Sequence, residues 1–241
     1  MYDLHNHLLP GIDDGAPDIG TSLELAKIAY QEGISYMVCT PHIHIGRFNN
    51  TKESINTALA EFKQALERSH IPMRVEAAAE VRVGPELIHL IKQDKLPFLG
   101  EWQGRKVLLL EFASNAIPHG SDNLLKWLLK EGVQPLIAHP ERNKVFQENP
   151  QKLVALVKSG CLLQVTASSL LGQFGSEAKS LAEYILTERM ATIIATDAHN
   201  VDYRPPLIKE ALSKAVQLIG GQRATELVID NPHAMTKSLF S

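Results

Sequence analysis

Imidazole and carboxylate side chains recur at the ends of short apolar runs in this chain of 241 residues. His5 and His7 share a two-residue spacing with Asp197 and His199, which places both side chains of each pair on the same side of an extended strand. One metal ion can bind both members of such a pair. Four more candidates stand at or just past other apolar runs: His42, Glu80, Glu111 and His139. Imidazole and carboxylate ligands without thiolate favour manganese, zinc, iron or magnesium.

Seven apolar runs, separated by amphipathic segments, would position these residues. We expect strands over 2–5, 34–40, 73–80, 106–112, 134–139, 161–166 and 191–196. Gly33, Gly132 and Gly160 stand where the intervening helices would end in a left-handed residue. Repeated strand–helix units with no linker predict one α/β domain over residues 1–241, a TIM-like (βα)7 barrel. Periodicity alone leaves a doubly wound sheet open.

The candidate residues would converge in such a barrel, because the C-terminal ends of parallel strands meet at one mouth. Every expected strand except 161–166 delivers a candidate there. Asp13 and Asp14 lie in the Gly- and Pro-rich segment PGIDDGAPD after the first strand, and we expect this segment to fold back over the mouth. Gly15 would permit the tight turn that this requires.

Each candidate also has an ordinary structural explanation. An isolated pair of histidines two residues apart occurs by chance, and Glu80 or Glu111 could form an ion pair with a neighbouring Lys or Arg. His139 could be a loop residue beside Pro140, and Asp197 could cap a helix. An unpaired carboxylate at the end of an apolar run is costly to bury. One shared site explains all of these residues together.

The remaining histidines fall into two groups. His44 and His119 lie in expected loops that could overhang the mouth. His70, His89 and His233 lie in expected helices or the C-terminal segment, where we expect solvation or packing.

Composition and missing motifs exclude several classes of protein. The 24 Lys and Arg residues against 27 Asp and Glu residues give a net charge of −3, without the basic excess that nucleic-acid binding favours. Without a signal peptide or a membrane-spanning run, we expect a soluble, cytoplasmic protein. Cys39 and Cys161 are expected to be buried thiols. No Walker loop, GxGxxG, GxSxG or cysteine-phosphatase loop is present.

Six motifs in order resemble the manganese-dependent bacterial protein-tyrosine phosphatases of the polymerase-and-histidinol-phosphatase (PHP) superfamily, of the capsule- and exopolysaccharide-associated type. These motifs are MYDLHNHLLPGIDDGAPD, CTPHIHIGRF, AAAEVRV, LLLEF, LIAHPERN and IATDAHN. The resemblance extends from Met1 to about residues 230–232, and the motifs are specific only in combination. It implies the distorted (βα)7 barrel of the PHP type and three divalent metal ions, manganese first, with iron, zinc or magnesium as alternatives.

The resemblance also implies a role for each candidate residue. The metal ligands would form three groups: His5, His7, Glu80 and Asp197; Glu80 as a bridge to Glu111 and His139; and Asp14, His42 and His199. Arg142, in HPERN, matches an arginine that lies beside the site in the family. Arg204, in YRPP, is similar to a second one, and Arg47 is a weaker match.

The implied activity is that of a protein-tyrosine phosphatase (EC 3.1.3.48), in which a metal-bound hydroxide attacks phosphorus. Arg142 and Arg204 would stabilise the equatorial charge, and His42 or His199 would donate a proton if one were needed. Four carboxylates beside three divalent cations leave a positive site that attracts a phosphate dianion. The implied partner is a phosphotyrosine protein, the C-terminal tail of a bacterial tyrosine kinase that regulates polysaccharide export. We expect no nucleic-acid partner and no membrane insertion.

Other functions remain open on the residues alone. A histidinol-phosphate phosphatase or another small-molecule phosphoesterase of the same superfamily would use the same metals. Amide or lactone hydrolysis on a related barrel usually needs a bridging carbamylated Lys or carboxylate, and no Lys stands at a strand end here. A binding module that uses metals only for stability is the alternative without turnover.

Overall fold

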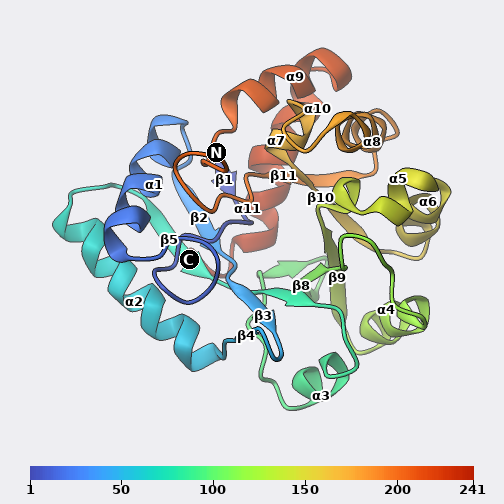
Figure 1. The fold of residues 1–241 in the computed structure, drawn as a ribbon, viewed down its shortest axis with the longest axis horizontal. Coiled ribbons are helices and arrows are strands. Elements are labelled where there is room, and N and C mark those ends of the chain that lie inside the picture. The colour runs from blue at the N-terminus through green and yellow to red at the C-terminus, as the bar shows by residue number, and fades with distance from the viewer.

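Parallel strands lie at the centre of the molecule and helices lie around them in the structure, a computed structural model that describes residues 1–241 (Figure 1). The strands are β1 (Tyr2–Asp3), β2 (Tyr36–Cys39), β3 (His42–His44), β4 (Phe48–Asn49), β5 (Arg74–Ala77), β6 (Glu80–Arg82), β7 (Glu101–Trp102), β8 (Arg105–Glu111), β9 (Val133–Ala138), β10 (Leu162–Thr166) and β11 (Ala191–Ala195). The helices are α1 (Ile19–Gln31), α2 (Lys52–Arg68), α3 (Leu87–Lys92), α4 (Ser121–Lys130), α5 (Lys144–Glu148), α6 (Gln151–Lys158), α7 (Ala167–Leu170), α8 (Ser176–Thr187), α9 (Lys209–Ile219), α10 (Gly221–Thr225) and α11 (Asn231–Thr236). A 3₁₀ turn, η1 (Pro140–Arg142), and a π-helical turn, η2 (Glu226–Asp230), complete the elements.

All seven expected strands are present within a few residues of their expected bounds. The expectation for 73–80 needs a correction, because β5 ends at Ala77 and Glu80 begins β6 instead of ending a strand. The chain breaks in the same way after β2, and His42 begins β3. Pro41 lies in this second break, where it lacks the backbone N–H that a continuous ladder would use.

The strands form two hydrogen-bonded sheets. β1, β2 and β5 pair in parallel, and the second sheet has the order β11-β10-β9-β8-β6-β3-β4. Only β4 and β7 pair antiparallel. A parallel bridge between Asn6 and Ala198 joins the segments that follow β1 and β11. The α/β class is confirmed, whereas the pairing does not close into the expected single barrel, because it divides at the breaks after β2 and β5.

The core has two parts that follow the strand alternation. Along β8, Leu108 and Leu110 belong to the larger apolar cluster, which includes the buried faces of the surrounding helices. Val107 and Leu109 point the other way, into a smaller cluster drawn mostly from the strands. The strands are therefore buried on both faces, as parallel strands covered by helices require.

The loops and helix ends agree with the local sequence signals. Gly33, Gly132 and Gly160 have the expected positive φ, with values of 82°, 76° and 100°. Asp18 caps α1 by accepting a hydrogen bond from the Thr21 N–H at 2.8 Å, which fixes the end of the segment that contains Asp13 and Asp14. None of the helices combines the length and apolar character needed to cross a bilayer.

The two cysteines are buried and unbridged, as expected. Burial raises the pKa of the Cys39 thiol well above its usual range, so Cys39 is a packing residue without thiolate character. Burial also raises the pKa of Cys161, to about 11.

Candidate metal centre

The C-terminal ends of several strands and the first residues of β3 and β6 surround one cavity of about 140 Å³. Its lining includes nearly all candidate residues: Asp14, His42, His44, Arg47, Glu80, Glu111, His139, Arg142, Asp197, His199 and Arg204. His5 and His7 are fully buried and contact Glu80 and Asp197 from behind. Residues from both ends of the sequence therefore meet in space.

Four buried side chains converge beside the cavity, and we call His5, His7, Glu80 and Asp197 the buried cluster. His5 Nε2 lies 3.3 Å from Glu80 Oε2 and 3.4 Å from Asp197 Oδ1, and His7 Nε2 lies 3.4 Å from each of these oxygens. Ligands about 2.1 Å from a tetrahedral centre stand about 3.4 Å apart. Glu80 Oε2 is buried and also lies 3.0 Å from His42 Nδ1, so it faces three imidazoles. This donor set fits a divalent cation.

Neighbouring side chains orient both imidazoles of the buried cluster. His5 Nδ1 lies 2.8 Å from Gln164 Oε1, and His7 Nδ1 lies 2.7 Å from Asp13 Oδ2. With Nδ1 directed at an oxygen, Nε2 of each imidazole faces the cluster and is the atom that would bind a metal. The carboxylates of Glu80 and Asp197 raise the pKa of His5, and Asp13 raises that of His7, despite their burial. Asp13 also accepts hydrogen bonds from the backbone N–H groups of His42 and Gly15. The segment from 10 to 18 is thus tied to the imidazole that it supports.

Glu111 and His139 extend the site to one side of Glu80. His139 Nε2 lies 2.9 Å from Glu80 Oε1, and Glu111 groups with Glu80 and His42. Burial and the nearby Glu80 raise the pKa of Glu111 to about 7. Arg82 partly offsets this repulsion, with its Nε 3.4 Å from Glu111 Oε2. Two carboxylates placed this close together favour a cation between them.

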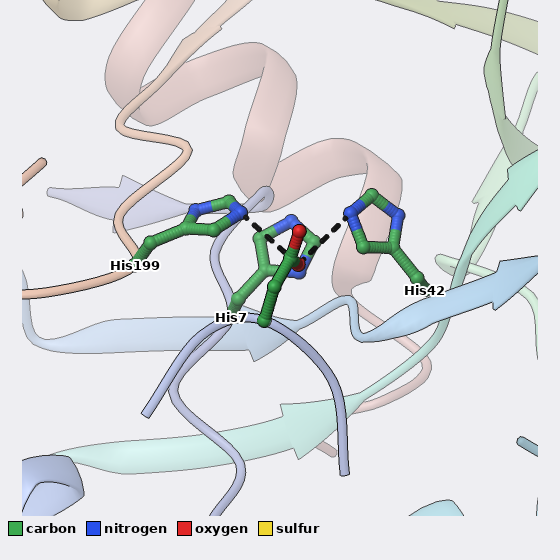
Figure 2. Close-up of side chains that lie close together, drawn as sticks. His7, His42 and His199 are labelled. Atoms are coloured by element: carbon green, nitrogen blue, oxygen red, sulfur yellow. Dashed lines mark ion pairs between the residues drawn. The ribbon is translucent and has the colours of Figure 1, made fainter. Parts of the chain in front are cut away.

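Three residues at the mouth, Asp14, His42 and His199, form a second group of potential ligands together with His7. We call these three residues the rim cluster. Figure 2 shows His42 and His199 on either side of His7, with their two ion pairs converging between them. The shared partner is Asp14 Oδ1, 3.3 Å from His42 Nε2 and 3.6 Å from His199 Nε2. The Asp14 side chain is 41% exposed, whereas those of the buried cluster are at most 1% exposed.

Gly15 allows the rim cluster to pack against the buried one. A Cβ at this position would lie 2.0 Å from the His7 carbonyl oxygen and 2.5 Å from the His7 Cβ. No side chain fits such an approach, so close packing against His7 explains this glycine, whereas its backbone does not have the positive φ of a glycine-dependent turn.

The imidazoles around the cavity have opposite pKa shifts. Burial lowers the pKa of His42, but hydrogen bonds to Asp14 and Glu80 outweigh it and raise the value to about 9. Burial and the neighbouring His7 lower the pKa of His199 to about 3. Burial and Arg142 lower that of His139 to about 4. His139 and His199 are therefore neutral near pH 7, the form in which an imidazole nitrogen binds a metal.

Arg142 and Arg204 approach the site together. Both donate hydrogen bonds to Asp197 Oδ2, which leaves Oδ1 facing His5 and His7. Their guanidinium carbons lie 4.3 and 5.8 Å from the centre of the Phe174 ring. Arg47 is different, because its side chain is 60% exposed and lies 3.6 Å from Asp14. Two arginines thus have restrained positions, and a third lies at the rim.

Two residues of the site occupy backbone conformations that favour glycine. His139 has φ of 31° and Asp197 has φ of 54°. Each follows the end of a strand, β9 or β11, and the turn aims its side chain into the cavity. Local strain of this kind concentrates at functional sites, where the surrounding structure enforces it.

The sequence did not single out four residues that shape the site. Gln164 lies on β10, the strand that offered nothing charged, and it also accepts a hydrogen bond from the His139 N–H at 3.0 Å. A polar residue within the apolar run CLLQVT was the available signal. Arg82 is brought beside Glu111 by the pairing of β6 with β8. Phe174 lies in a loop and contacts the two arginines, and Ser114 lines the cavity. Nothing local marked these three.

The remaining histidines separate clearly. His44 lines the cavity, whereas His119 is exposed and is not part of its lining. His89 and His233 are exposed on α3 and α11, and His70 occupies a turn with φ of 52° after α2. These last three take no part in the site.

The sequence of this chain is similar to a known protein family and to several bacterial proteins. Residues 1–237 match the family model described as capsular polysaccharide synthesis, CpsB/CapC. CapC of Staphylococcus aureus is 37% identical over 210 residues, which are 87% of this chain and 81% of that protein. The Bacillus subtilis protein named tyrosine-protein phosphatase YwqE is 34% identical over 212 residues, 88% of this chain and 82% of its own.

Solved structures agree with this placement. A crystal structure from work on YwqE of Bacillus subtilis and CpsB of Streptococcus pneumoniae, described as metal-dependent tyrosine phosphatases, matches with a TM-score of 0.90 and 31% identity, covering 98% of this chain and 94% of that chain. A variant of an organophosphorus hydrolase matches with a TM-score of 0.59 and 14% identity, covering 97% of this chain and 92% of its own, which is a likeness of fold alone. The chain belongs to the capsular polysaccharide synthesis family CpsB/CapC.

Proposed function

We propose that this protein is a metal-dependent tyrosine-protein phosphatase that hydrolyses phosphotyrosine in a protein substrate. The observation that carries the proposal is the buried cluster, whose four ligand atoms have the spacing of a metal-binding set and lie beside two restrained arginines. Relatives over most of the chain are named tyrosine-protein phosphatases. The metal and the arginines supply what a phosphate monoester needs, which is positive charge around its oxygens.

We assign the proposed metal ligands to three groups, as the sequence predicts, for three divalent ions with manganese as the first choice. His5, His7, Glu80 and Asp197 would hold one ion. Glu80, Glu111 and His139 would hold the second, and the rim cluster the third. Because the ligands come from residue 5 to residue 199, residues 1–241 would form one domain, a distorted barrel of the PHP type.

The residues of this chain have separate tasks in the proposed reaction. When bound, divalent cations polarise phosphoryl oxygens and lower the pKa of water. Arg142 and Arg204 would bind non-bridging oxygens, and a guanidinium suits this task because it forks onto two of them. Tyrosine has an ordinary pKa of about 10, so its oxygen leaves readily. His42 and His199 therefore act first as ligands, and proton donation is their secondary role.

The proposed partner is the phosphotyrosine-bearing tail of a bacterial tyrosine kinase that controls polysaccharide export. The proposed location of this reaction is the cytoplasm. The family name supports the capsule context. An extended tail suits this site, because the cavity opens at the rim through the half-exposed Asp14 and the exposed Arg47. A disordered segment can enter such a mouth without a closing lid.

The ratio of kcat/KM for a phosphotyrosine peptide to that for histidinol phosphate tests the proposal in the manganese-loaded protein. We expect a large preference for the peptide. A preference for histidinol phosphate would retain the metal site and reassign the substrate to a small molecule. Absence of turnover on both, together with unfolding on chelation, would instead indicate a metal-stabilised binding module.

A further inference from the structure

A second hollow adjoins the metal centre. It has a volume of about 200 Å³ and lies between the β3–β4 hairpin and the segment from β6 to α3, elements that neighbour one another in Figure 1. His44 and Arg82 line both this hollow and the cavity of the metal centre. We call it the side groove. The two spaces therefore share part of their lining.

The side groove differs in chemistry from the metal centre. Six apolar side chains line it: Ile43, Ile45, Val81, Val83, Leu87 and Leu90. Ile45 is 51% exposed at the edge of the groove, and exposure of its apolar side chain to water is unfavourable. Glu86 is its one acidic lining residue. An apolar cavity of roughly 150 Å³ can hold a benzene molecule, so the groove has room for a leucine-sized side chain.

We propose that the side groove binds an apolar side chain of the substrate, two residues away from the phosphotyrosine. This inference rests on the proposed function. In an extended peptide, side chains two positions apart point the same way and stand about 6.6 Å apart along the backbone. With the phosphotyrosine in the metal centre, the next side chain on that face reaches the groove across His44 and Arg82.

Two features favour a phosphorylated peptide as the occupant. First, the groove shares His44 and Arg82 with the cavity proposed to take the phosphate, so one extended chain can reach both. Second, Arg47 and Arg82 supply positive charge on the side where the two spaces meet, which complements a phosphorylated chain. Arg82 is also held from the metal side by Glu111, so the partition between the two spaces has a defined position.

Capped pentapeptides with a central phosphotyrosine test this inference. One series carries Leu, Ala or Asp two positions before the phosphotyrosine, and a second series carries them two positions after it, with Ala elsewhere. We expect kcat/KM for Leu to exceed that for Asp by about 10-fold in one of the two series, because an apolar pocket discriminates side chains on this scale. The gain should lie mainly in KM, because the contact is remote from the phosphorus.

A matched pair of variants locates the effect. Ile45→Asp removes apolar surface at the groove edge, whereas Ile88→Asp makes the same change at an isoleucine of α3 that is 39% exposed and does not line the groove. We expect Ile45→Asp to abolish the preference for Leu and to lower kcat/KM for the Leu peptide several-fold more than for free phosphotyrosine. Ile88→Asp should keep the preference of the parent protein.

The outcomes separate this inference from the function on which it rests. Equal kcat/KM for Leu and Asp peptides in both series would overturn the side groove as a subsite while leaving phosphotyrosine hydrolysis intact. A Leu preference that survives Ile45→Asp would also overturn it. Absence of turnover on every phosphotyrosine substrate, with metal bound, would refute the proposed function itself.

Discussion

The buried cluster and the rim cluster offer similar ligands in different settings. The atoms of His5, His7, Glu80 and Asp197 lie within 3.4 Å of their partners and out of reach of solvent. Asp14, by contrast, is half-exposed and lies 3.3 to 3.6 Å from its two histidines. Three members of the first set follow the ends of β1 and β11 and Glu80 begins β6, whereas Asp14 depends on a surface segment. Attachment to the strands, more than residue type, therefore separates the buried ligands from Asp14.

Backbone contacts account for this difference. The Asp197 N–H donates to the His5 carbonyl oxygen at 2.7 Å, and the His7 N–H donates to the Ala198 carbonyl oxygen at 2.8 Å. Two ligands of the buried cluster thus move only if the joined strand ends move. Asp14 is positioned through its neighbours Asp13 and Gly15, which contact His7. We expect loss of a buried ligand to cost more activity than loss of the rim ligand.

Asp197→Asn should produce the largest effect. The amide keeps the shape of the side chain but removes the negative charge that faces His5 and His7 on one side and two arginines on the other. We expect kcat/KM to fall by about 1,000-fold or more, with loss of bound metal measured by elemental analysis. Asp202→Asn, an exposed change in the following loop, is the control. Near-normal activity with full metal content would refute the ligand assignment.

Arg142→Ala should rank second and act without removing metal. Its guanidinium neighbours Asp197 and lines the cavity, so its loss removes positive charge from the position assigned to the phosphoryl oxygens. We expect a decrease in kcat/KM of about 100-fold, the scale of one lost donor to a transition-state charge. Metal content should stay at the parental level, as it should in the exposed Arg105→Ala control. Loss of metal would mean that Arg142 acts by holding Asp197.

Asp14→Asn tests the rim cluster directly. His42 and His199 remain in place, so we expect the affinity for one metal ion to weaken while the other ions stay bound. Activity should fall by about 10- to 50-fold at limiting manganese and recover partly at high manganese, since weakened binding responds to mass action. A loss as large as that of Asp197→Asn would remove the distinction between the clusters.

Gly15→Ala should give the smallest and most local change. The added Cβ meets the His7 backbone, so the segment that carries Asp13 and Asp14 must shift outward. We expect activity to fall by about 10-fold, near the lower end of the effects seen when the partner that orients a metal-binding histidine is removed. Gly221→Ala, where a Cβ meets nothing within 4 Å, is the matched control. An unchanged Gly15→Ala variant would show that the rim segment adapts freely.

Much of this arrangement can be predicted from the sequence. Strand and helix periodicity placed the ends of β1, β2, β8, β9 and β11 within a few residues. The two-residue spacings of His5 with His7 and of Asp197 with His199 marked the pairs that lie together in the cavity region. Local patterns sufficed here because strand direction dictates where each strand end lies.

The rest depends on contacts between distant segments. The breaks that make Glu80 and His42 the first residues of strands follow from how two sheets meet, which hydrophobic periodicity does not encode. Gln164 acts through its distances to His5 and to the His139 backbone, 159 and 25 residues away in sequence. Sequence patterns that span a few residues carry no information on such partners. The assignment of each ligand to a particular metal stays a prediction.

The union of the first and last strands has a consequence for synthesis of the protein. His5 and His7 leave the ribosome at the start of translation, whereas Asp197 and His199 leave only near its end. Until then the emerging chain holds histidines and Glu80 without the carboxylate that completes their cluster. A nascent or truncated chain that stops before residue 197 would therefore lack the complete site. The protein would therefore become active only after β11 and the residues that follow it have been synthesised.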